Sequence, residues 1–220
     1  MLNKEEREER RHQLGASEIY KISNFNSLQC QVLWEEKIGI SEQKEIDNKH
    51  VRAGNILEQP CLDFYGENNN ISLKLNERIE SKKVRGFVAS LDARDIKNNI
   101  PIENKVIGVR TWYQMYAKRK SNAGYSTIKL NIPNMYFLQV QAQIHVCNAD
   151  YGIILFNVLT DEQKEDPLNV VVNDFIQRPV KIDRNDVIID EIIKRADYFM
   201  FCINHKKRPS EIEYQRKELF

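Results

Sequence analysis

The sequence predicts an α/β protein in which one mixed sheet is flanked by helices. Apolar residues recur at helical spacing in the first third of the chain and again near its end. Between residues 71 and 109 they alternate instead at the period of two that is typical of strands. No internal repeat or linker interrupts the 220 residues, a length that suits a single domain over residues 1–220 with one core.

The expected helices share apolar residues placed three or four positions apart. They cover residues 14–22, 27–40, 47–66, 134–148 and 184–207. Pro60 would kink the third of these helices, and Gly66 would end it. Residues 1–15 are expected to be a charged lead-in, and residues 207–220 a frayed tail.

The expected strands are short apolar segments bounded by turn residues. They cover residues 71–75, 84–93, 102–109, 151–159 and 169–182. The polar turn at 94–101 would join the second strand to the third. On that third strand Glu103 and Lys105 share one face, while Asn104 lies on the other, because side chains alternate along a strand.

Composition excludes several classes of protein. No run of 18 apolar residues is present, and the first residues lack the apolar stretch of a signal peptide, so a cytoplasmic protein without a membrane span is expected. Four scattered cysteines lack the close spacing of zinc or iron–sulfur sites and are expected to be reduced, mostly buried thiols; they are Cys30, Cys61, Cys147 and Cys202.

The net charge of +1 hides a basic segment. Between Lys105 and Lys129 there is no acidic residue, and Lys118, Arg119 and Lys120 follow one another directly. Four aromatic residues are interleaved with these cations. Such a mixture can bind a phosphate backbone and stack on bases, and it is equally typical of a solvated loop.

Asp92, Glu103 and Lys105 are the residues that could carry chemistry. Carboxylates are preferred ligands of Mg²⁺, and a neighbouring lysine can orient water or offset charge on a phosphate. In a chain so rich in charged residues the pattern D-x(10)-E-x-K also arises by chance, as exposed charges on a hairpin. The pattern alone leaves both interpretations open.

Several segments in order resemble one known family. Their sequences are RRHQLGASEI, VLWEEKIG, AGNILEQPCLDFY, GFVASLDA, PIENKVI and YFLQVQAQIHV. Together they resemble the YqaJ-like viral recombinase family, the lambda-exonuclease-like branch of the PD-(D/E)xK nucleases. The resemblance spans about residues 8–160 and implies a restriction-endonuclease-like core with a mixed central sheet flanked by helices.

The resemblance also implies a role for individual residues. Asp92 and Glu103, the backbone carbonyl of Asn104, and Glu58 would hold Mg²⁺, for which Mn²⁺ could substitute. Lys105 would position or activate the attacking water, with Gln139 close to it. The residues implied to contact DNA are Arg10, Ser17, Tyr136 and Gln141, and the basic residues Lys118, Arg119 and Lys120 are added as candidates from the charge pattern. Arg10 and Ser17 would hold the 5′ phosphate of a strand end. Arg11 is an adjacent candidate for the role of Arg10, and Ser17 could instead cap a helix.

The chain departs from the family pattern at three positions. Leu91 replaces a proline, Ala93 replaces a glycine, and Asn104 replaces an apolar residue. An amide on the core side of a strand would need a hydrogen-bond partner.

Gln143 lies on the same helix face as Tyr136 and Gln139, but the resemblance assigns it no role.

The expected activity is that of a Mg²⁺-dependent DNA exonuclease acting at duplex ends in recombination or repair. The alternatives are an endonuclease with the same core and a catalytically inactive DNA-binding module. The implied partners are double-stranded DNA ends and a single-strand annealing protein, with a homo-oligomer as a further possibility. The segment that contains Arg10 and GASE favours the exonuclease, because an endonuclease does not need to bind a strand end.

Overall fold

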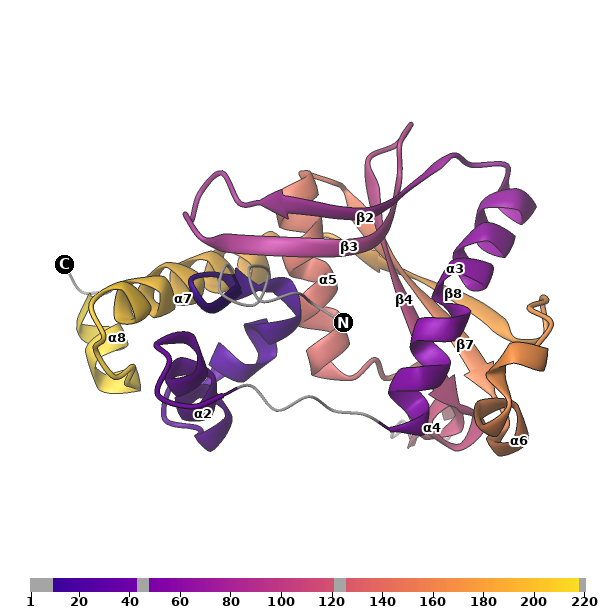
Figure 1. Cartoon of the computed structure of the whole chain (residues 1–220), viewed down its shortest axis with the longest axis horizontal. Helices are drawn as coiled ribbons and strands as arrows, with labels where there is room; N and C mark the ends of the chain where they lie inside the picture. Colours follow the sequence, from indigo (N-terminus) through magenta and orange to yellow (C-terminus); the bar gives the residue numbers. More distant parts are fainter. Residues whose placement is uncertain (1–9, 43–47, 121–125, 218–220) are drawn as a thin grey trace.

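The computed structural model describes residues 10–42, 48–120 and 126–217, and the side chains of residues 116–129 and 217 lie outside this description. A six-stranded sheet occupies the centre of the protein, and helices flank it (Figure 1). Its strands are β1 (Leu14–Gly15), β2 (Leu73–Glu80), β3 (Phe87–Asp95), β4 (Ile100–Gly108), β7 (Tyr151–Leu159) and β8 (Gln177–Asp183). Parallel pairs (β1–β3, β4–β7) and antiparallel pairs (β2–β3, β3–β4, β7–β8) both occur, so the prediction of a mixed sheet is confirmed.

The remaining elements are helices and one small hairpin. The helices are η1 (Ala16–Ser23), α2 (Leu28–Lys37), α3 (Lys49–Asn69), α4 (Val109–Met115), α5 (Asn134–Cys147), α6 (Asp161–Glu165), η2 (Pro167–Asn169), α7 (Asp186–Asn204) and α8 (Glu211–Lys217). The hairpin consists of β5 (Tyr116–Lys120) and β6 (Ser126–Leu130), which pair antiparallel. Helix α3 continues through Pro60 and ends at Asn69, not at Gly66 as expected, because Asn70 adopts the left-handed conformation that ends the helix.

The two faces of β4 and β7 are covered by different helices (Figure 1). Ile154 and Phe156 pack with Val140 and Ile144 of α5. Leu155, one residue along β7, packs with Leu62 and other residues of α3 on the opposite face. Because side chains alternate along β4, α5 meets Glu103 and Lys105, whereas α3 covers the face that carries Asn104.

Strands β3 and β4 separate from one another at residues 89–92 of β3. Val88 pairs with both Glu80 of β2 and Gly15 of β1, so β1 lies on the edge of β3 opposite β2. Strand β4 uses the same edge as β1 but pairs only with Ala93–Asp95. Residues 89–92 therefore have no strand partner on this edge within the described chain. We call this gap between β1 and β4 the fork.

The adjoining strand bends at the same level. Asn76 of β2 lies between the pairs Leu75–Ala93 and Glu77–Leu91, which places it opposite Asp92. Its φ of 53° is in the left-handed region, which asparagine tolerates better than most residues. A residue in this conformation interrupts the regular pleat of β2 beside Asp92.

The structure corrects four further expectations about secondary structure. Residues 14 and 15, expected in the lead-in, form β1, and residues 1–9 lie outside the described chain. The basic segment contains α4 and the β5–β6 hairpin instead of a loop. Strand β8 begins at Gln177, not near residue 169, because the preceding residues form η2 and a turn.

The tail is the fourth correction, because residues 211–217 form helix α8. Tyr214 is only 5% exposed and lies edge-on to Phe25, with ring centroids 5.3 Å apart. Glu211 accepts a hydrogen bond from the Phe25 N–H and pairs with Arg195 at 2.9 Å. So short a helix would be marginal alone, and these contacts stabilise it.

The expectation about the cysteines is confirmed. All four are buried thiols outside any disulfide in the described chain, and burial raises the pKa of the Cys30, Cys61 and Cys147 thiols to about 12. None of the described helices combines the length and apolar character needed to cross a bilayer.

Candidate active site

The fork brings together the acidic residues that the sequence separates. Asp92 lies on β3 at the last position before pairing with β4 begins, and Glu103 lies at the corresponding position of β4. The Asn104 N–H donates to Asp92 Oδ2 at 2.7 Å, so a side chain takes the place of a β3 carbonyl as acceptor. This bond ties the two separating strands together at the carboxylates.

Glu103 is held by three donors although it is only 2% exposed. Lys105 Nζ donates to Oε1, and Gln139 Nε2 donates to the same oxygen at 2.6 Å. Gln143 Nε2 donates to Oε2. A buried carboxylate requires such partners, and here two of the three come from α5.

Glu103 is close enough to Asp92 and Glu58 to raise the pKa of both carboxyl groups. Burial, followed by the charge on Glu103, raises the pKa of Asp92 to about 8, and Lys105 and the Asn104 N–H only partly oppose this. Burial and then Glu103 also raise the pKa of Glu58, which reaches the cluster from α3. Burial alone would lower the pKa of Lys105, but the charge on Glu103 raises it above its ordinary value. The cluster therefore has unfavourable negative charge that a cation would relieve.

These residues fit a hydrated Mg²⁺ ion better than a metal caged entirely by protein. Among the described residues, no group of three or more His, Cys, Asp or Glu side chains is placed to hold a metal ion. Mg²⁺ usually keeps several waters and uses one or two carboxylates. Asp92 and Glu103, with the Asn104 carbonyl beside them, supply hard oxygen donors of this kind.

The amide of Asn104 has the partner that its buried position requires. Asn157 Nδ2 donates to Asn104 Oδ1 at 2.6 Å, and both side chains are buried. Gln177 Nε2 donates to Asn157 Oδ1 at 3.3 Å and to the Cys61 carbonyl of α3 at 2.9 Å. A chain of amides thus connects β4, β7 and β8 to the helix that carries Glu58. The polar residue at position 104 is accommodated by this chain and leaves no unsatisfied Asn104 oxygen.

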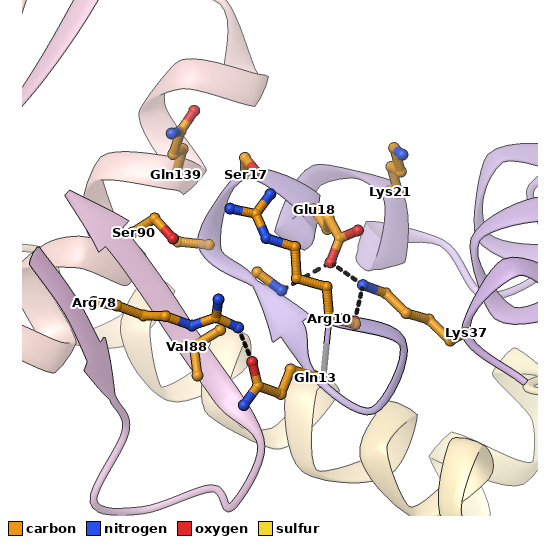
Figure 2. Close-up of a pocket in the computed structure, with 12 residues that line it drawn as sticks. Arg10, Gln13, Ser17, Glu18, Lys21, Lys37, Arg78, Val88, Ser90 and Gln139 are labelled. Atoms are coloured by element: carbon orange, nitrogen blue, oxygen red, sulfur yellow. Dashed lines mark hydrogen bonds and ion pairs between the residues drawn. The ribbon is translucent and has the colours of Figure 1, made fainter. Parts of the chain in front are cut away.

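A basic pocket of about 250 Å³ opens beside the acidic cluster. Its walls come from β1, η1, α2, β2, β3 and α5, and the polar residues that line it are Arg10, Gln13, Ser17, Glu18, Lys21, Lys37, Arg78, Ser90 and Gln139. Figure 2 shows the guanidinium groups of Arg10 and Arg78 extending into the same space, with Ser17 and Ser90 beside it.

One acid in this pocket is neutralised by its neighbours. Glu18 Oε2 accepts from the Gly15 N–H and pairs with Lys37 Nζ, both at 2.8 Å (Figure 2). Gly15, not Ser17, is the N-cap of η1, so the Ser17 hydroxyl is not used as the cap. Arg10, Lys21 and Arg78 leave the pocket with a net positive charge.

Gln139 belongs to both regions. Its amide donates to Glu103 at 2.6 Å, and the same residue lines the basic pocket. Ser90, also in the pocket, lies two residues before Asp92 on β3, a separation of roughly 7 Å along a strand. An anion in the pocket would therefore lie next to the carboxylates.

The remaining predicted residues have different placements. Lys105 Nζ lies 5.5 Å from the Tyr136 ring centre, which places Tyr136 against the cluster. Gln141 is fully buried on another face of α5, where it donates to the Asp183 carbonyl and accepts from the Asn185 N–H. Its amide stabilises the β8–α7 connection, so the structure does not bring it to the predicted DNA-binding position. The side chains of Lys118, Arg119 and Lys120 lie outside the described part of the chain.

Sequence reasoning missed several residues of the site. Gln143 could have been found from its position one turn after Gln139 on the same helix face. Ser90 could have been found from its two-residue spacing to Asp92. Arg78, Asn157 and Gln177 had no local signal, because strand pairing brings them to the site.

Solved structures share this fold. An alkaline exonuclease from Laribacter hongkongensis, LHK-Exo, matches with a TM-score of 0.68 at 19% identity, over 96% of this chain and 94% of that chain. LHK-Exo in complex with dAMP matches with a TM-score of 0.70 at 19% identity, over 99% and 98% of the two chains. A phage-related exonuclease from Haemophilus somnus 129PT matches with a TM-score of 0.60 at 16% identity, over 88% and 96%.

These likenesses confirm the predicted restriction-endonuclease-like core, a mixed central sheet flanked by helices. None of the curated proteins matches the sequence significantly. The sequence profile of the YqaJ-like viral recombinase domain matches residues 7–150, which include both the fork and the basic pocket. The chain is therefore a member of the YqaJ-like viral recombinase domain family.

Proposed function

We propose that this protein is a Mg²⁺-dependent exonuclease that hydrolyses phosphodiester bonds at the ends of duplex DNA. The observation that carries the proposal is the sharing of Gln139 between the acidic cluster and the basic pocket. A phosphate in the pocket puts the neighbouring phosphate of the same strand at Asp92 and Glu103. Membership of the family and the fold shared with exonucleases support the same reaction.

The shape of the pocket suits a terminal phosphate. Its walls come from several elements, with η1 and Lys37 of α2 on the side that Glu18 also lines. Arg10 and Ser17 are assigned to the phosphate of a 5′ end, with Arg78, Lys21 and Ser90 as further contacts.

The chemistry divides between the cation and the residues around it. When bound, Mg²⁺ would activate water and offset charge that develops on the phosphate. Asp92, Glu103, the Asn104 carbonyl and Glu58 would hold the ion, and Mn²⁺ could take its place. Lys105, which is paired with Glu103, would donate a hydrogen bond to the attacking water or to a phosphate oxygen. Gln139 keeps Glu103 oriented and separates the two phosphate positions.

Two alternatives make different predictions for the same experiment. An endonuclease with this core would not need a pocket that binds the end of a DNA strand. An inactive binding module would keep the pocket without a working cluster. The observation against the inactive module is that Asn104, the residue that departs from the family pattern, is satisfied by Asn157.

The proposal is tested by digesting linear and covalently closed circular duplex DNA, with Mg²⁺ and with EDTA, beside a Lys105→Ala variant. Loss of linear DNA alone, abolished by EDTA and by the substitution, is the expected result. Cleavage of both forms would favour the endonuclease. Binding without cleavage of either form would favour the inactive module.

The biological setting follows from the substrate. An exonuclease of this kind in the cytoplasm would prepare DNA ends for recombination or repair. Single-stranded DNA left by digestion is the ligand of an annealing protein, which is the partner we propose. A homo-oligomer that surrounds the duplex would keep the enzyme on its substrate. Both assemblies are testable by co-purification and by light scattering on DNA.

A further inference from the structure

Gln143 contacts the centre of the candidate site although the family resemblance assigns it no role. It lies one helical turn after Gln139 on α5 and is fully buried. Its Nε2 donates to Glu103 Oε2, while Gln139 donates to Glu103 Oε1 at 2.6 Å. Two amides on one face of a helix therefore hold the two oxygens of one carboxylate.

The donors to each Glu103 oxygen determine which lone pair of the carboxylate remains open. An ionised carboxylate offers about two lone-pair sites on each oxygen. Oε1 of Glu103 accepts from both Lys105 and Gln139, which occupies its sites. Oε2 accepts from Gln143, which occupies one of its two sites. The direction of the remaining lone pair is then fixed by the Gln143 amide.

A second observation separates Gln143 from an ordinary packing residue. Its Oε1 is a buried acceptor with no hydrogen-bond partner among the described residues. Leaving such an atom unsatisfied is unfavourable, so an apolar side chain of the same size would suit the core better. Gln141, two residues earlier and equally buried, uses both ends of its amide within the fold. The contact with Glu103 is what distinguishes the position of Gln143.

We propose that Gln143 is a positioning residue that orients the Glu103 carboxylate, so that one Oε2 lone pair is presented to the divalent cation between Glu103 and Asp92. This inference rests on the proposed function, because it requires a cation at the fork. Gln143 does not itself touch DNA or water in this role. It acts through Glu103, by preventing rotation of the carboxylate.

The test compares Gln143→Met with the matched variant Gln141→Met. Both remove one buried amide from α5 and keep the length of the side chain. Mn²⁺ binding to the full-length protein is measured by titration calorimetry, and thermal unfolding is followed in EDTA. For Gln143→Met we expect a 10- to 100-fold rise in the Mn²⁺ dissociation constant, the range found when partners of metal ligands are removed. For Gln141→Met we expect a lower unfolding temperature with Mn²⁺ affinity unchanged within about twofold.

The nuclease assay gives an independent readout. The Mn²⁺ concentration for half-maximal digestion should rise in Gln143→Met by the same factor as the dissociation constant, while the rate at saturating Mn²⁺ falls less. Should Gln143→Met not fold, Gln143→Asn keeps the amide but withdraws it by one methylene from Oε2, and the same shift is expected.

The outcomes also separate this inference from the function on which it rests. Equal Mn²⁺ affinity in the wild type and in a folded Gln143 variant would overturn the positioning role alone. Failure of the wild type to bind Mn²⁺, or equal binding by Asp92→Asn, would remove the cation site and with it the proposed function. An equal loss of affinity in Gln141→Met would show a general effect of loosening α5, and would also overturn the positioning role.

Discussion

The acidic cluster and the basic pocket meet at Gln139 but are built differently. In the cluster Glu103 is 2% exposed and has three donors, and Asp92 is fixed by a backbone N–H. In the pocket Arg10 and Arg78 are exposed, and Lys37 forms an ion pair with Glu18. Buried charges held by hydrogen bonds keep the side chains in a fixed geometry but lower the stability of the fold. Exposed charges attract anions, and salt weakens this attraction.

The largest effect is expected from Asp92→Asn, which breaks the cluster while preserving its shape. The Asn104 N–H can still donate to the amide oxygen, but one charge that holds the cation is lost. Activity on linear duplex DNA should fall by about 10³-fold, equivalent to about 4 kcal/mol in the transition state. The rate is measured with saturating DNA and Mg²⁺. Activity within tenfold of the wild type would place the chemistry elsewhere.

Asn157→Leu tests the rigid support behind the cluster. It removes the donor to Asn104 Oδ1, and a buried acceptor left unsatisfied should lower the free energy of unfolding by about 2 kcal/mol. Adding Asn104→Val removes the acceptor too, so the double variant should be more stable than the sum of the two single losses implies, by about 1 kcal/mol. Urea unfolding of the four proteins measures this coupling. Strict additivity would mean that the two amides do not act together.

The stability of the protein should depend on pH, because the acidic cluster contains buried charge. The pKa of Asp92 is about 8 in the folded protein, against an ordinary value of 3.8. The raised pKa means that its contribution to stability is complete below about pH 4 and is lost as pH rises through about 8.

In EDTA, Asp92→Asn should therefore gain stability over the wild type between pH 5 and pH 8. The gain should be on the order of 1 kcal/mol at pH 8, because the asparagine amide carries no charge that burial disfavours. Thermal unfolding at several pH values measures it. A constant difference between the two proteins at all pH values would contradict the raised pKa.

The smallest effects are expected in the basic pocket. Arg10→Ala should weaken use of 5′-phosphorylated duplex ends by about tenfold, with little change on 5′-hydroxyl ends. Arg78→Ala should reduce the use of these ends only a few-fold, because the Arg78 guanidinium also donates a hydrogen bond to Gln13. Both losses should shrink as salt is raised, unlike the loss in Asp92→Asn.

The matched control for these arginines is Lys207→Ala. Lys207 is exposed and pairs with Glu213 of α8 (Figure 1), and it is not among the residues that line the pocket. It should behave as wild type on both kinds of end. Equal losses in all three variants would indicate general attraction to DNA in place of a phosphate pocket.

Local patterns in the sequence are enough to predict the elements that carry the site. Alternation along β4 puts Glu103 and Lys105 on one face, and helical spacing puts Gln139 and Gln143 on one face of α5. These are local properties of the backbone, so a short stretch of sequence is enough to predict them. The same holds for the helix that carries Glu58 and for the strand that carries Asp92.

How these elements meet depends on contacts between residues far apart in the chain. The fork exists because β1 and β4 use separate parts of one edge of β3, and nothing local in β3 encodes this. Asn157 satisfies Asn104 from 53 positions away, and Glu211 reaches Phe25 from 186 positions away. Gln141 and Gln143 are two residues apart, yet one bonds to the β8–α7 turn and the other to Glu103. Contacts of this kind depend on what packs against each face, and that is settled only when the whole chain has folded.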